Sequence, residues 1–355
     1  MENIKQNLQI TKVKQSKLAT TDLSKLSFGQ TFTDHMFVCD YKDGSWQTPQ
    51  ILPYGPLQLD PSAKVFHYGQ AVFEGMKAYK DENDKVWLFR PDENFNRINK
   101  SSKRLAIPEF PEDFFFDGLK ELMQLEKDWI QKGMGNSLYI RPFVISTEAG
   151  VSASPASEYR FMIICSPAQA YYSGEVRVKI SEDYSRSADG GIGFAKAAGN
   201  YAGQFYPTDL AKEEGYQQVI WTDSNSHEYL EEAGTMNVFF RIGDKLITAP
   251  TSDRILDGVT RKSILELAKN ENVEVEVRKI KVSELTEAAK AGTLKEIFGS
   301  GTAAVVTPIL GFGYKGEKFE LPTIDDSYGK RFKQQLLNIQ YNIAEDKFNW
   351  RYAID

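Results

Sequence analysis

The sequence contains few of the residues that commonly hold structural metals or form disulfides. Among its 355 residues there are only two cysteines, Cys39 and Cys165, and three histidines. The cysteines form no Cys-x-x-Cys pair, so we expect free, packed thiols in a reducing compartment. His227 and Glu228 could begin a zinc-protease motif, but the second histidine of that motif is missing. We therefore expect no bound metal.

The chain also lacks a long apolar run and an excess of basic charge. No apolar stretch approaches the ~18 residues that a membrane-spanning helix needs, so we expect no membrane partner. Lysine and arginine number 43 against 49 acidic residues, and the net charge of −6 argues against nucleic acid as the main partner. Residues 3–20 contain lysine but no arginine, which is unlike a transit peptide. We expect a cytoplasmic protein whose N-terminal segment is mobile or lies at an edge.

The rest of the composition is typical of a globular protein with two domains. Hydrophobic residues make up 41% of the chain and charged residues 26%, and one domain usually has ~100–200 residues. Predicted strands follow one another without strict alternation with helices, which favours an α+β fold over a doubly wound sheet. The composition becomes polar and glycine-rich before residue 193. We place a small N-terminal α+β domain at 1–170, a linker at 171–180 and a larger domain at 181–355.

Hydrophobic periodicity and turn residues indicate the individual elements. In the first domain we expect strands at 76–80, 86–90, 137–147 and 159–167, and helices at 94–105 and 116–133. In the second we expect strands at 216–223, 236–242, 245–250 and 273–280, a strand–turn–strand unit at 295–309, and helices at 261–270, 283–292 and 327–346. Gly243-Asp244 predicts a hairpin, Ser283 is the expected helix cap, and Gly133 and Gly292 are the expected helix ends.

Two glycine motifs match the dinucleotide-binding fingerprint in letters only. GFGYKG (311–316) has the form G-x-G-x-x-G, and GSGTAA (299–304) has the form that ends in alanine. Dinucleotide binding needs a helix directly after the glycines, because the helix N-terminus binds the pyrophosphate. Neither motif precedes a predicted helix, which argues against a nicotinamide oxidoreductase. We expect a hairpin turn at 311–316, while the turn at 299–304 could also bind an anion through its backbone N–H groups.

Three segments have both a chemical and a purely structural interpretation. Lys196 is the one lysine within 191–203, a stretch rich in glycine and alanine; it is either a solvated surface group or a desolvated amine able to form a Schiff base. Glu231 and Glu232 are either solvated or placed to meet a cationic ring nitrogen. The glycine turn before Thr260 is either a plain helix cap or a phosphate site at a helix N-terminus.

Taken together, eight segments resemble the branched-chain amino acid aminotransferases, which are pyridoxal-phosphate enzymes of fold type IV. They follow the order of that family and span nearly the whole chain, and they resemble its longer, eukaryote-type branch, which also occurs in bacteria. The segments are FGQTFTDHMF (28–37), FHYGQAVFEGMKAY (66–79), FRPDENFNRI (89–98), SLYIRPF (137–143), AKAAGNYAG (195–203), EAGTMNVFF (232–240), LDGVTR (256–261) and GSGTAAVVTPI (299–309). The resemblance implies a two-domain α+β fold of type IV.

The resemblance also implies which residues bind pyridoxal 5'-phosphate. Lys196 would be joined covalently to the cofactor and would carry the proton between the substrate and the cofactor. Tyr201 would bind the ring oxygen O3′, Glu232 would pair with the pyridine nitrogen, and Thr235 would lie near the ring. The phosphate would be bound by a separate group of residues, namely Arg97, Val259, Thr260 and Thr302.

The implied reaction is ping-pong transfer of an amino group between L-leucine, L-isoleucine or L-valine and 2-oxoglutarate. The Thr302 and Ala303 amides and the Tyr68 hydroxyl would bind the substrate's α-carboxylate, and Arg141 would bind the γ-carboxylate of glutamate. The residues expected to form the side-chain pocket are Phe28, Phe73, Tyr139, Tyr171 and Val151. In the family, Tyr68 and Val151 come from the neighbouring subunit, which implies a homodimer. A D-amino acid aminotransferase or an aminodeoxychorismate lyase on the same fold is the alternative.

The chain departs from the family pattern in one place that bears on regulation. Many mammalian relatives have a redox-sensitive Cys-x-x-Cys just after the glycine turn, whereas this chain has Ala304 and Thr307 there. We therefore expect no thiol switch at this place. The chain is also shorter than the mammalian pattern around 148–152, which affects the alignment of Val151.

Overall fold

The computed structural model describes residues 8–169, 175–303 and 305–354. The chain packs into two compact units. One consists of Met1–Tyr171, Ala195–Ala198 and Asn338–Asp355, and the other of Tyr172–Phe194 and Gly199–Leu337. Residues 195–198 thus pack with the first unit, although they follow the expected linker in the sequence. The assignment of 171–180 as the linker stays a prediction, since 171–174 lie outside the described residues.

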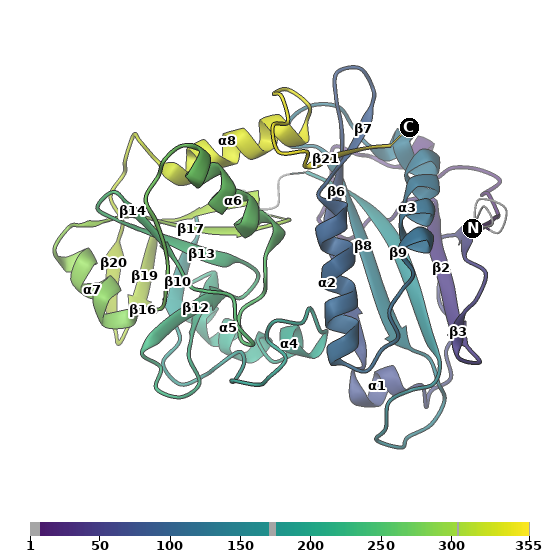
Figure 1. Cartoon of the computed structure of the whole chain (residues 1–355), viewed down its shortest axis with the longest axis horizontal. Coiled ribbons are helices and arrows are strands. Elements are labelled where there is room, and N and C mark those ends of the chain that lie inside the picture. The colour runs from purple at the N-terminus through teal and green to yellow at the C-terminus, as the bar shows by residue number, and fades with distance from the viewer. Residues whose placement is uncertain (1–7, 170–174, 304, 355) are drawn as a thin grey trace. The chain divides into compact units, whose positions relative to one another are not determined.

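A large, mainly antiparallel sheet forms the centre of the first unit (Figure 1). Its strands, in spatial order, are β1 (Gln9–Ile10), β4 (Gln50–Pro53), β2 (His35–Lys42), β9 (Tyr159–Ala168), β8 (Ser137–Ser146), β6 (Met76–Lys80), β7 (Val86–Phe89) and β21 (Arg351–Ile354). Two further strands, β3 (Ser45–Trp46) and β5 (Ala71–Phe73), pair with β2 and β8 respectively. β1 pairs in parallel with β4 at the edge, so the edge-lying alternative for the N-terminal segment is confirmed for these two residues.

The helices of the first unit are α1 (Lys64–Tyr68), α2 (Pro91–Arg104) and α3 (Glu112–Glu126), with 3-10 turns η2 (Leu18–Thr20) and η3 (Lys127–Trp129). The two long helices each bury one face, whereas α1 is mostly exposed. α2 begins with a proline, has acids in its first turn and has bases in its last turn, which suits the helix dipole. Gly118 lies inside α3 because a β-carbon there would be 2.2 Å from the Phe37 ring. Each fully buried phenylalanine in this core contributes roughly 1.5–3 kcal/mol.

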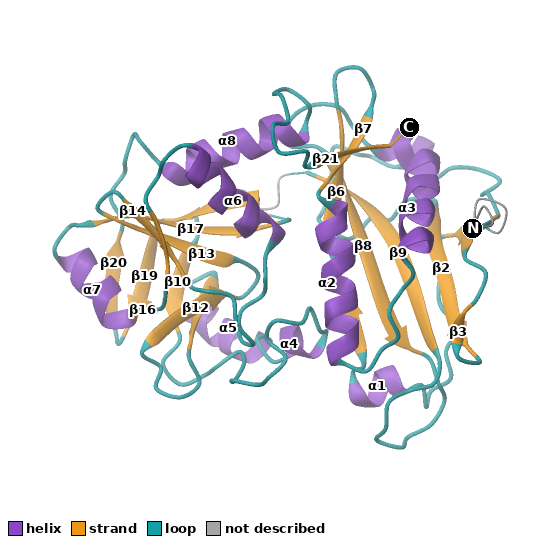
Figure 2. Ribbon diagram, in the orientation of Figure 1, coloured by secondary structure: helices purple, strands orange, loops and turns teal. Residues whose placement is uncertain are grey.

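The second unit contains two sheets (Figure 2). The first has the order β16 (Ile280–Lys281), β12 (Tyr229–Ala233), β11 (Gln218–Thr222), β10 (Arg177–Ile180), β19 (Gly311–Tyr314) and β20 (Glu317–Glu320). The other has the order β15 (Val275–Val277), β14 (Lys245–Thr248), β13 (Asn237–Ile242), β17 (Leu294–Gly301) and β18 (Val305–Ile309). The helices that begin in this unit are α4 (Gly199–Ala202), α5 (Phe205–Glu213), α6 (Val259–Asn270), α7 (Val282–Lys290) and α8 (Tyr328–Gln340). Phe240, Ile247 and Ile297 belong to its buried core.

Most of the expected elements are present, and the two glycine hairpins are confirmed. Gly243 has a φ of 59° in the turn between β13 and β14, and Gly316 has a φ of 77° in the turn between β19 and β20. The buried, free state of both cysteines is also confirmed.

Several boundaries are wrong. α3 ends at Glu126 rather than at Gly133, and Ser283 lies inside α7 rather than at its cap. The strand expected at 273–280 is two short strands, and α8 ends at Gln340. Helix ends depend on local capping contacts, which hydrophobic periodicity does not report.

Candidate active site

Lys196 is held by its backbone in the first unit. Its carbonyl accepts a hydrogen bond from Phe73 N at 3.0 Å, and Ala198 N donates to Ala71 O at 3.1 Å, so the segment lies along β5 as a short extra strand. The Lys196 N–H donates to Ser101 Oγ of α2 at 2.9 Å. The neighbours on either side are buried alanines, which let the backbone pack this closely. These bonds fix the position from which the lysine side chain starts.

The Lys196 amine lies among an aromatic ring and charged groups. Its Nζ is 4.7 Å from the centroid of the Phe73 ring. Burial by itself raises the pKa of the Glu74 carboxyl, but the charge and hydrogen bonds of Arg97, together with the charge of Lys196, outweigh burial and lower that pKa. The half-buried amine is therefore within the electrostatic reach of a buried carboxylate.

Arg97 is anchored by the same carboxylate. Its Nε lies 2.6 Å from Glu74 Oε1 and its Nη2 lies 2.8 Å from Glu74 Oε2, which is a bidentate ion pair. Asn94, one turn earlier on α2, donates to Glu74 Oε2 at 2.7 Å. Glu74 belongs to the segment 66–79, which supports the family resemblance, but no role for its carboxylate could be predicted from the sequence. Its fully buried charge is visible only in the structure.

Three of the residues expected in the side-chain pocket, Phe28, Phe73 and Tyr139, lie together with Arg141 in the first unit. Arg141 Nη2 donates to Tyr139 OH at 2.8 Å, and the guanidinium carbon is 4.7 Å from the Phe73 ring centroid. Phe28 packs edge-on against Tyr139 with a centroid distance of 4.9 Å. The Nε atom of Arg141 is buried and has no hydrogen-bond partner. These side chains form an aromatic wall in which the Nε–H of Arg141 can still donate a hydrogen bond to a ligand.

Gly75 is required by this pocket wall. A β-carbon at this position would lie 2.2 Å from the Tyr139 hydroxyl and 3.0 Å from its Cζ. Gly75→Ala should therefore displace Tyr139 and raise KM for amino acid substrates roughly tenfold to a hundredfold, because small misplacements of a binding group have large kinetic effects. Steady-state kinetics would measure this change. Gly55→Ala is the matched control, since no atom lies within 4 Å of its β-carbon; an unchanged KM for Gly75→Ala would contradict the role of Tyr139.

Tyr68 and Val151 contact each other, and both side chains are exposed in this chain. The Tyr68 hydroxyl donates to the Val151 carbonyl, and their exposed fractions are 45% and 66%. The segment before Val151 is tied to α1 by the ion pair of Lys64 with Glu148, at 2.8 Å, which helps to lower the pKa of Glu148 to about 2. Their assignment to a neighbouring subunit's site stays a prediction. Tyr171 and Ala304 lie outside the described residues.

In the second unit, Glu232 is buried on β12 and surrounded by donors. Arg186 forms an ion pair with its Oε1, while Asn237 Nδ2 and Leu256 N lie 3.0 and 3.2 Å from its Oε2. The interpretation of Glu231 and Glu232 as solvated acids was wrong, because both are buried within β12. Adjacent strand residues point to opposite faces, and Glu231 accordingly pairs with a different arginine, Arg254, at 2.6 Å.

Glu231 should make stability depend on pH near neutrality. Burial raises the pKa of its carboxyl to about 7, although Arg254 and Arg186 oppose this. Since the folded pKa lies above the ordinary value near 4.5, the protein should lose stability as pH rises from about 4.5 to 7, by at most about 3 kcal/mol. Glu231→Gln should remove that slope. Urea unfolding of both proteins across this range would measure it, with Glu228→Gln, at an exposed ion pair, as the control. Equal slopes for Glu231→Gln and the wild type would refute the prediction.

The residues expected to bind phosphate in the second unit lie at the start of α6 and in the turn after β17. α6 begins with Val259 and Thr260, both buried, and has no acid in its first turn, so its N-terminal N–H groups favour an anion. A β-carbon on Gly258 would be 2.0 Å from Asn237 Oδ1. Asn237 therefore contacts both Glu232 and the residue before α6. Neither Asn237 nor Arg186 was predicted as a site residue, because nothing in the neighbouring sequence indicates that they contact Glu232.

The remaining assigned residues of the second unit are Thr235, Thr302, Ala303 and Tyr201. A β-carbon on Gly301 would be 3.2 Å from the carbonyl oxygen of Thr235, which places the turn containing Thr302 and Ala303 against the Thr235 backbone. The Thr235 hydroxyl accepts a hydrogen bond from Gln218 Nε2 at 3.2 Å. Tyr201 lies half-buried in α4.

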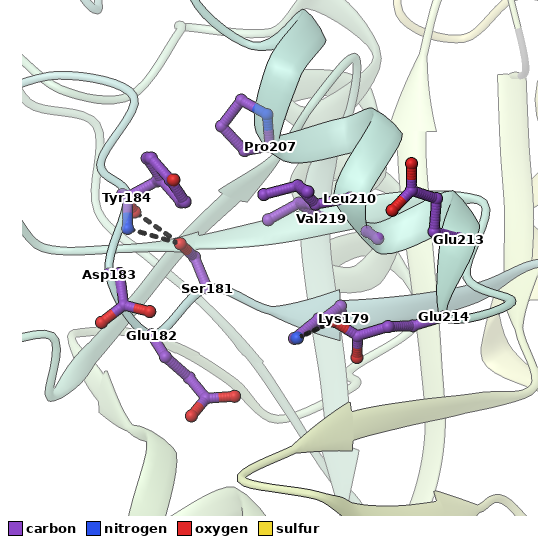
Figure 3. A pocket seen from close by; sticks show the side chains of 11 residues that line it. Lys179, Ser181, Glu182, Asp183, Tyr184, Pro207, Leu210, Glu213, Glu214 and Val219 are labelled. Atoms are coloured by element: carbon purple, nitrogen blue, oxygen red, sulfur yellow. Dashed lines mark hydrogen bonds and ion pairs between the residues drawn. The ribbon is translucent and has the colours of Figure 1, made fainter.

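A pocket of about 420 Å³ in the second unit contains none of the assigned residues (Figure 3). It lies beside α5 and β10, and its charged lining residues are four acids and one lysine. Lys179 pairs with Glu214 there. Its lining residues are Lys179, Ser181, Glu182, Asp183, Tyr184, Pro207, Leu210, Ala211, Glu213, Glu214 and Val219. An acidic wall does not suit a phosphate or a carboxylate, so we do not place the active site in this pocket.

Each unit, taken by itself, offers groups whose chemistry suits a part of pyridoxal 5'-phosphate. The first unit provides a primary amine at Lys196, which can join an aldehyde, and a guanidinium at Arg97 for a phosphate. The second provides a buried carboxylate at Glu232 for a ring nitrogen and helix-opening amides for a phosphate. The glycine at position 258 lets Asn237 approach the start of α6, because a β-carbon there would lie 2.0 Å from Asn237 Oδ1.

Comparison with known proteins identifies the class to which this fold and these residues belong. Residues 71–312 match the family model of the class IV amino-transferases, so the chain belongs to this family. In the described residues, no helix is both long enough and apolar enough to cross a membrane.

Similar curated proteins and solved structures include branched-chain amino acid aminotransferases. The chain is 44% identical to "Branched-chain-amino-acid transaminase 1" of Bacillus subtilis (strain 168), over 94% of this chain and 95% of that protein. Branched-chain amino acid aminotransferase from Escherichia coli has a TM-score of 0.73 at 24% identity, covering 91% and 99% of the two chains. That of Thermobaculum terrenum, in its PLP-form (holo-form), has a TM-score of 0.72 at 19% identity, covering 92% and 100%. The predicted two-domain α+β fold of type IV is confirmed.

Proposed function

We propose that the protein is a pyridoxal-phosphate-dependent branched-chain amino acid transaminase. It would transfer the amino group between L-leucine, L-isoleucine or L-valine and 2-oxoglutarate, giving branched 2-oxo acids and L-glutamate. The name of the Bacillus subtilis relative supports this substrate class, and the PLP-form of the Thermobaculum terrenum enzyme supports the cofactor. One observation carries the proposal: the Lys196 amine and the Arg141 guanidinium both lie 4.7 Å from the ring centroid of Phe73.

When bound, pyridoxal phosphate supplies an electron sink for the pair of electrons released at the substrate's α-carbon. Lys196 would attach the cofactor and then, as a free amine, remove and return the proton at the α-carbon. Glu232 would hold a proton at the pyridine nitrogen, because Arg186 and Asn237 fix its carboxylate. Tyr201 would bind O3′ and Thr235 would lie near the ring. The phosphate would be bound by Arg97, the amides of Val259 and Thr260, and Thr302.

The pocket must accept both an alkyl side chain and a carboxylate. Phe28, Phe73 and Tyr139 provide the apolar wall that suits leucine. A bare carboxylate would lose several kcal/mol on entering such a wall without a partner. Arg141 resolves this conflict, because its buried Nε atom has donor capacity left while Nη2 stays bonded to Tyr139. The amides of Thr302 and Ala303, with Tyr68 from a second subunit of a homodimer, would bind the α-carboxylate.

Substrate kinetics test this function directly. The purified protein, supplied with pyridoxal phosphate, is expected to transaminate L-leucine, L-isoleucine and L-valine with 2-oxoglutarate as acceptor. D-Alanine and aminodeoxychorismate test the two alternative activities on the same fold. A rate with either of these that exceeds all three branched-chain rates would replace the proposal, and failure to bind pyridoxal phosphate would remove it.

A further inference from the structure

Glu74 is a fully buried carboxylate to which the reaction outlined above assigns no part. It lies in the short connection between β5 and β6, and its backbone N–H donates to Pro142 O at 2.7 Å. Its side chain has no exposed surface. Burying a charge this completely is unfavourable unless partners compensate for the lost water.

Besides the backbone N–H of Gly75, which donates to Oε2 at 3.1 Å, the hydrogen-bond partners of the Glu74 carboxylate are side chains on one face of α2. Asn94 and Arg97 are three residues apart, and Ser101 follows four residues later, so their side chains project from the same side of the helix. Asn94 and Arg97 bind the Glu74 carboxylate, while Ser101 accepts the backbone N–H of Lys196. One face of α2 thus fixes the positions of the Arg97 guanidinium, the Glu74 carboxylate and the Lys196 backbone relative to one another.

The bidentate contact determines how the guanidinium of Arg97 is oriented. Two N–H groups on one edge of a planar fork are bound at 2.6 and 2.8 Å, so rotation about the side-chain bonds would break at least one of them. The plane of the guanidinium is therefore fixed, and so is the direction in which its other edge, which carries Nη1, points. Asn94 restrains the carboxylate in turn at 2.7 Å, which removes the remaining freedom of the pair.

We propose that Glu74 is a positioning residue that orients the Arg97 guanidinium toward the phosphate group of pyridoxal phosphate. This inference rests on the proposed function. It also has a consequence that distinguishes it from simple charge attraction. The Glu74 carboxylate partly cancels the positive charge of Arg97 and Lys196, so its removal would strengthen the attraction of a phosphate if net charge alone governed binding. If orientation governs binding, its removal weakens the contact.

The test compares two ligands that differ only in the phosphate. Pyridoxal 5'-phosphate and pyridoxal both react with Lys196, so the ratio of their dissociation constants isolates the contribution of the phosphate and cancels effects on the amine. The cofactor is removed from the full-length protein, and both ligands are titrated spectroscopically into wild type, Glu74→Gln and Glu74→Asp. We expect both variants to lower the preference for the phosphorylated ligand at least tenfold. Glu74→Asp keeps the charge but shortens the reach, so a loss there cannot come from charge.

Two comparisons make the result specific to Arg97. Glu93→Gln removes an acid from the same helix, where it pairs with Arg90 at 2.8 Å, and should leave the preference unchanged. In an Arg97→Lys background, which lacks the planar fork, Glu74→Gln should have little further effect. Circular dichroism and thermal unfolding monitor folding, and Glu74→Asp stands in if Glu74→Gln does not fold.

The possible failures can be told apart. An unchanged or increased preference for the phosphorylated ligand in Glu74→Gln and Glu74→Asp, with wild type binding normally, would overturn the positioning role alone. A wild-type protein that binds pyridoxal phosphate no better than pyridoxal would overturn the positioning role and the proposed phosphate site together. A wild type that binds neither ligand would overturn the proposed function itself.

Discussion

Lys196→Ala is expected to abolish covalent cofactor attachment and to lower transamination by about 10⁴-fold or more. The amine has two parts in the proposed reaction, attachment of the aldehyde and transfer of the proton at the α-carbon, and removal of a general base alone can account for about 10²–10⁴-fold. The Lys196 amine lies 4.7 Å from the centroid of the Phe73 ring, beside the pocket wall formed by Tyr139 and Arg141. The effect should therefore appear in both binding and rate.

Borohydride reduction of the wild-type protein with its cofactor, followed by peptide mass spectrometry, would locate the attachment. The label should lie on the peptide that contains Lys196, and the visible absorbance of the bound cofactor should be lost in Lys196→Ala. Lys212→Ala is a suitable control, since Lys212 is exposed and pairs with Asp209 at 2.8 Å. Labelling of a different lysine, or full activity of Lys196→Ala, would refute the central assignment.

Arg141→Met is expected to separate the two classes of substrate. It should lower kcat/KM for glutamate and 2-oxoglutarate by about 10²–10³-fold, because a carboxylate would then enter an aromatic pocket without a charged donor. The value for leucine should fall by less than about tenfold, since methionine preserves much of the apolar volume. Substrate-by-substrate steady-state kinetics on both half-reactions would measure the difference.

Arg160→Met provides the matched control for Arg141→Met. Arg160 lies on the neighbouring strand β9 and pairs with Asp40 at 2.6 Å, away from the Phe73 ring. Its loss should affect both substrate classes equally, through stability alone. A parallel fall in kcat/KM for leucine and glutamate in Arg141→Met would show that Arg141 is structural and would leave the acceptance of glutamate without an explanation.

Part of the pocket follows from local pattern. Residues 137–147 read as a strand, and side chains two residues apart on a strand share a face, which places Tyr139 and Arg141 side by side as observed. The hairpin at 311–316 was equally predictable, because its glycines precede no helix. Such features depend on neighbours in the chain, and the periodicity of the sequence reports them.

Other contacts join residues that no local pattern connects. Glu74 and Arg97 are 23 residues apart, and Lys196 meets Ser101 across 95 positions. Asn237 contacts Glu232 across a strand turn and Leu256 beyond the next hairpin. These contacts matter because Glu74 and Glu232 are buried, and a carboxylate needs hydrogen-bond donors from the protein once it is removed from water. The resemblance pointed to Arg97 and Lys196, but the carboxylate that holds one and influences the other emerged only from the fold.

The amino-acid sequence by itself determined the order of most strands and helices, the absence of cysteine pairs at metal or disulfide spacing, and the family to which the chain belongs. Tertiary structure decided which charges are buried and which partners they meet. The physical reason is that periodicity and turn chemistry act over a few residues, whereas the environment of Glu74, Glu231 and Glu232 is created by strands and helices that meet only when the chain has folded.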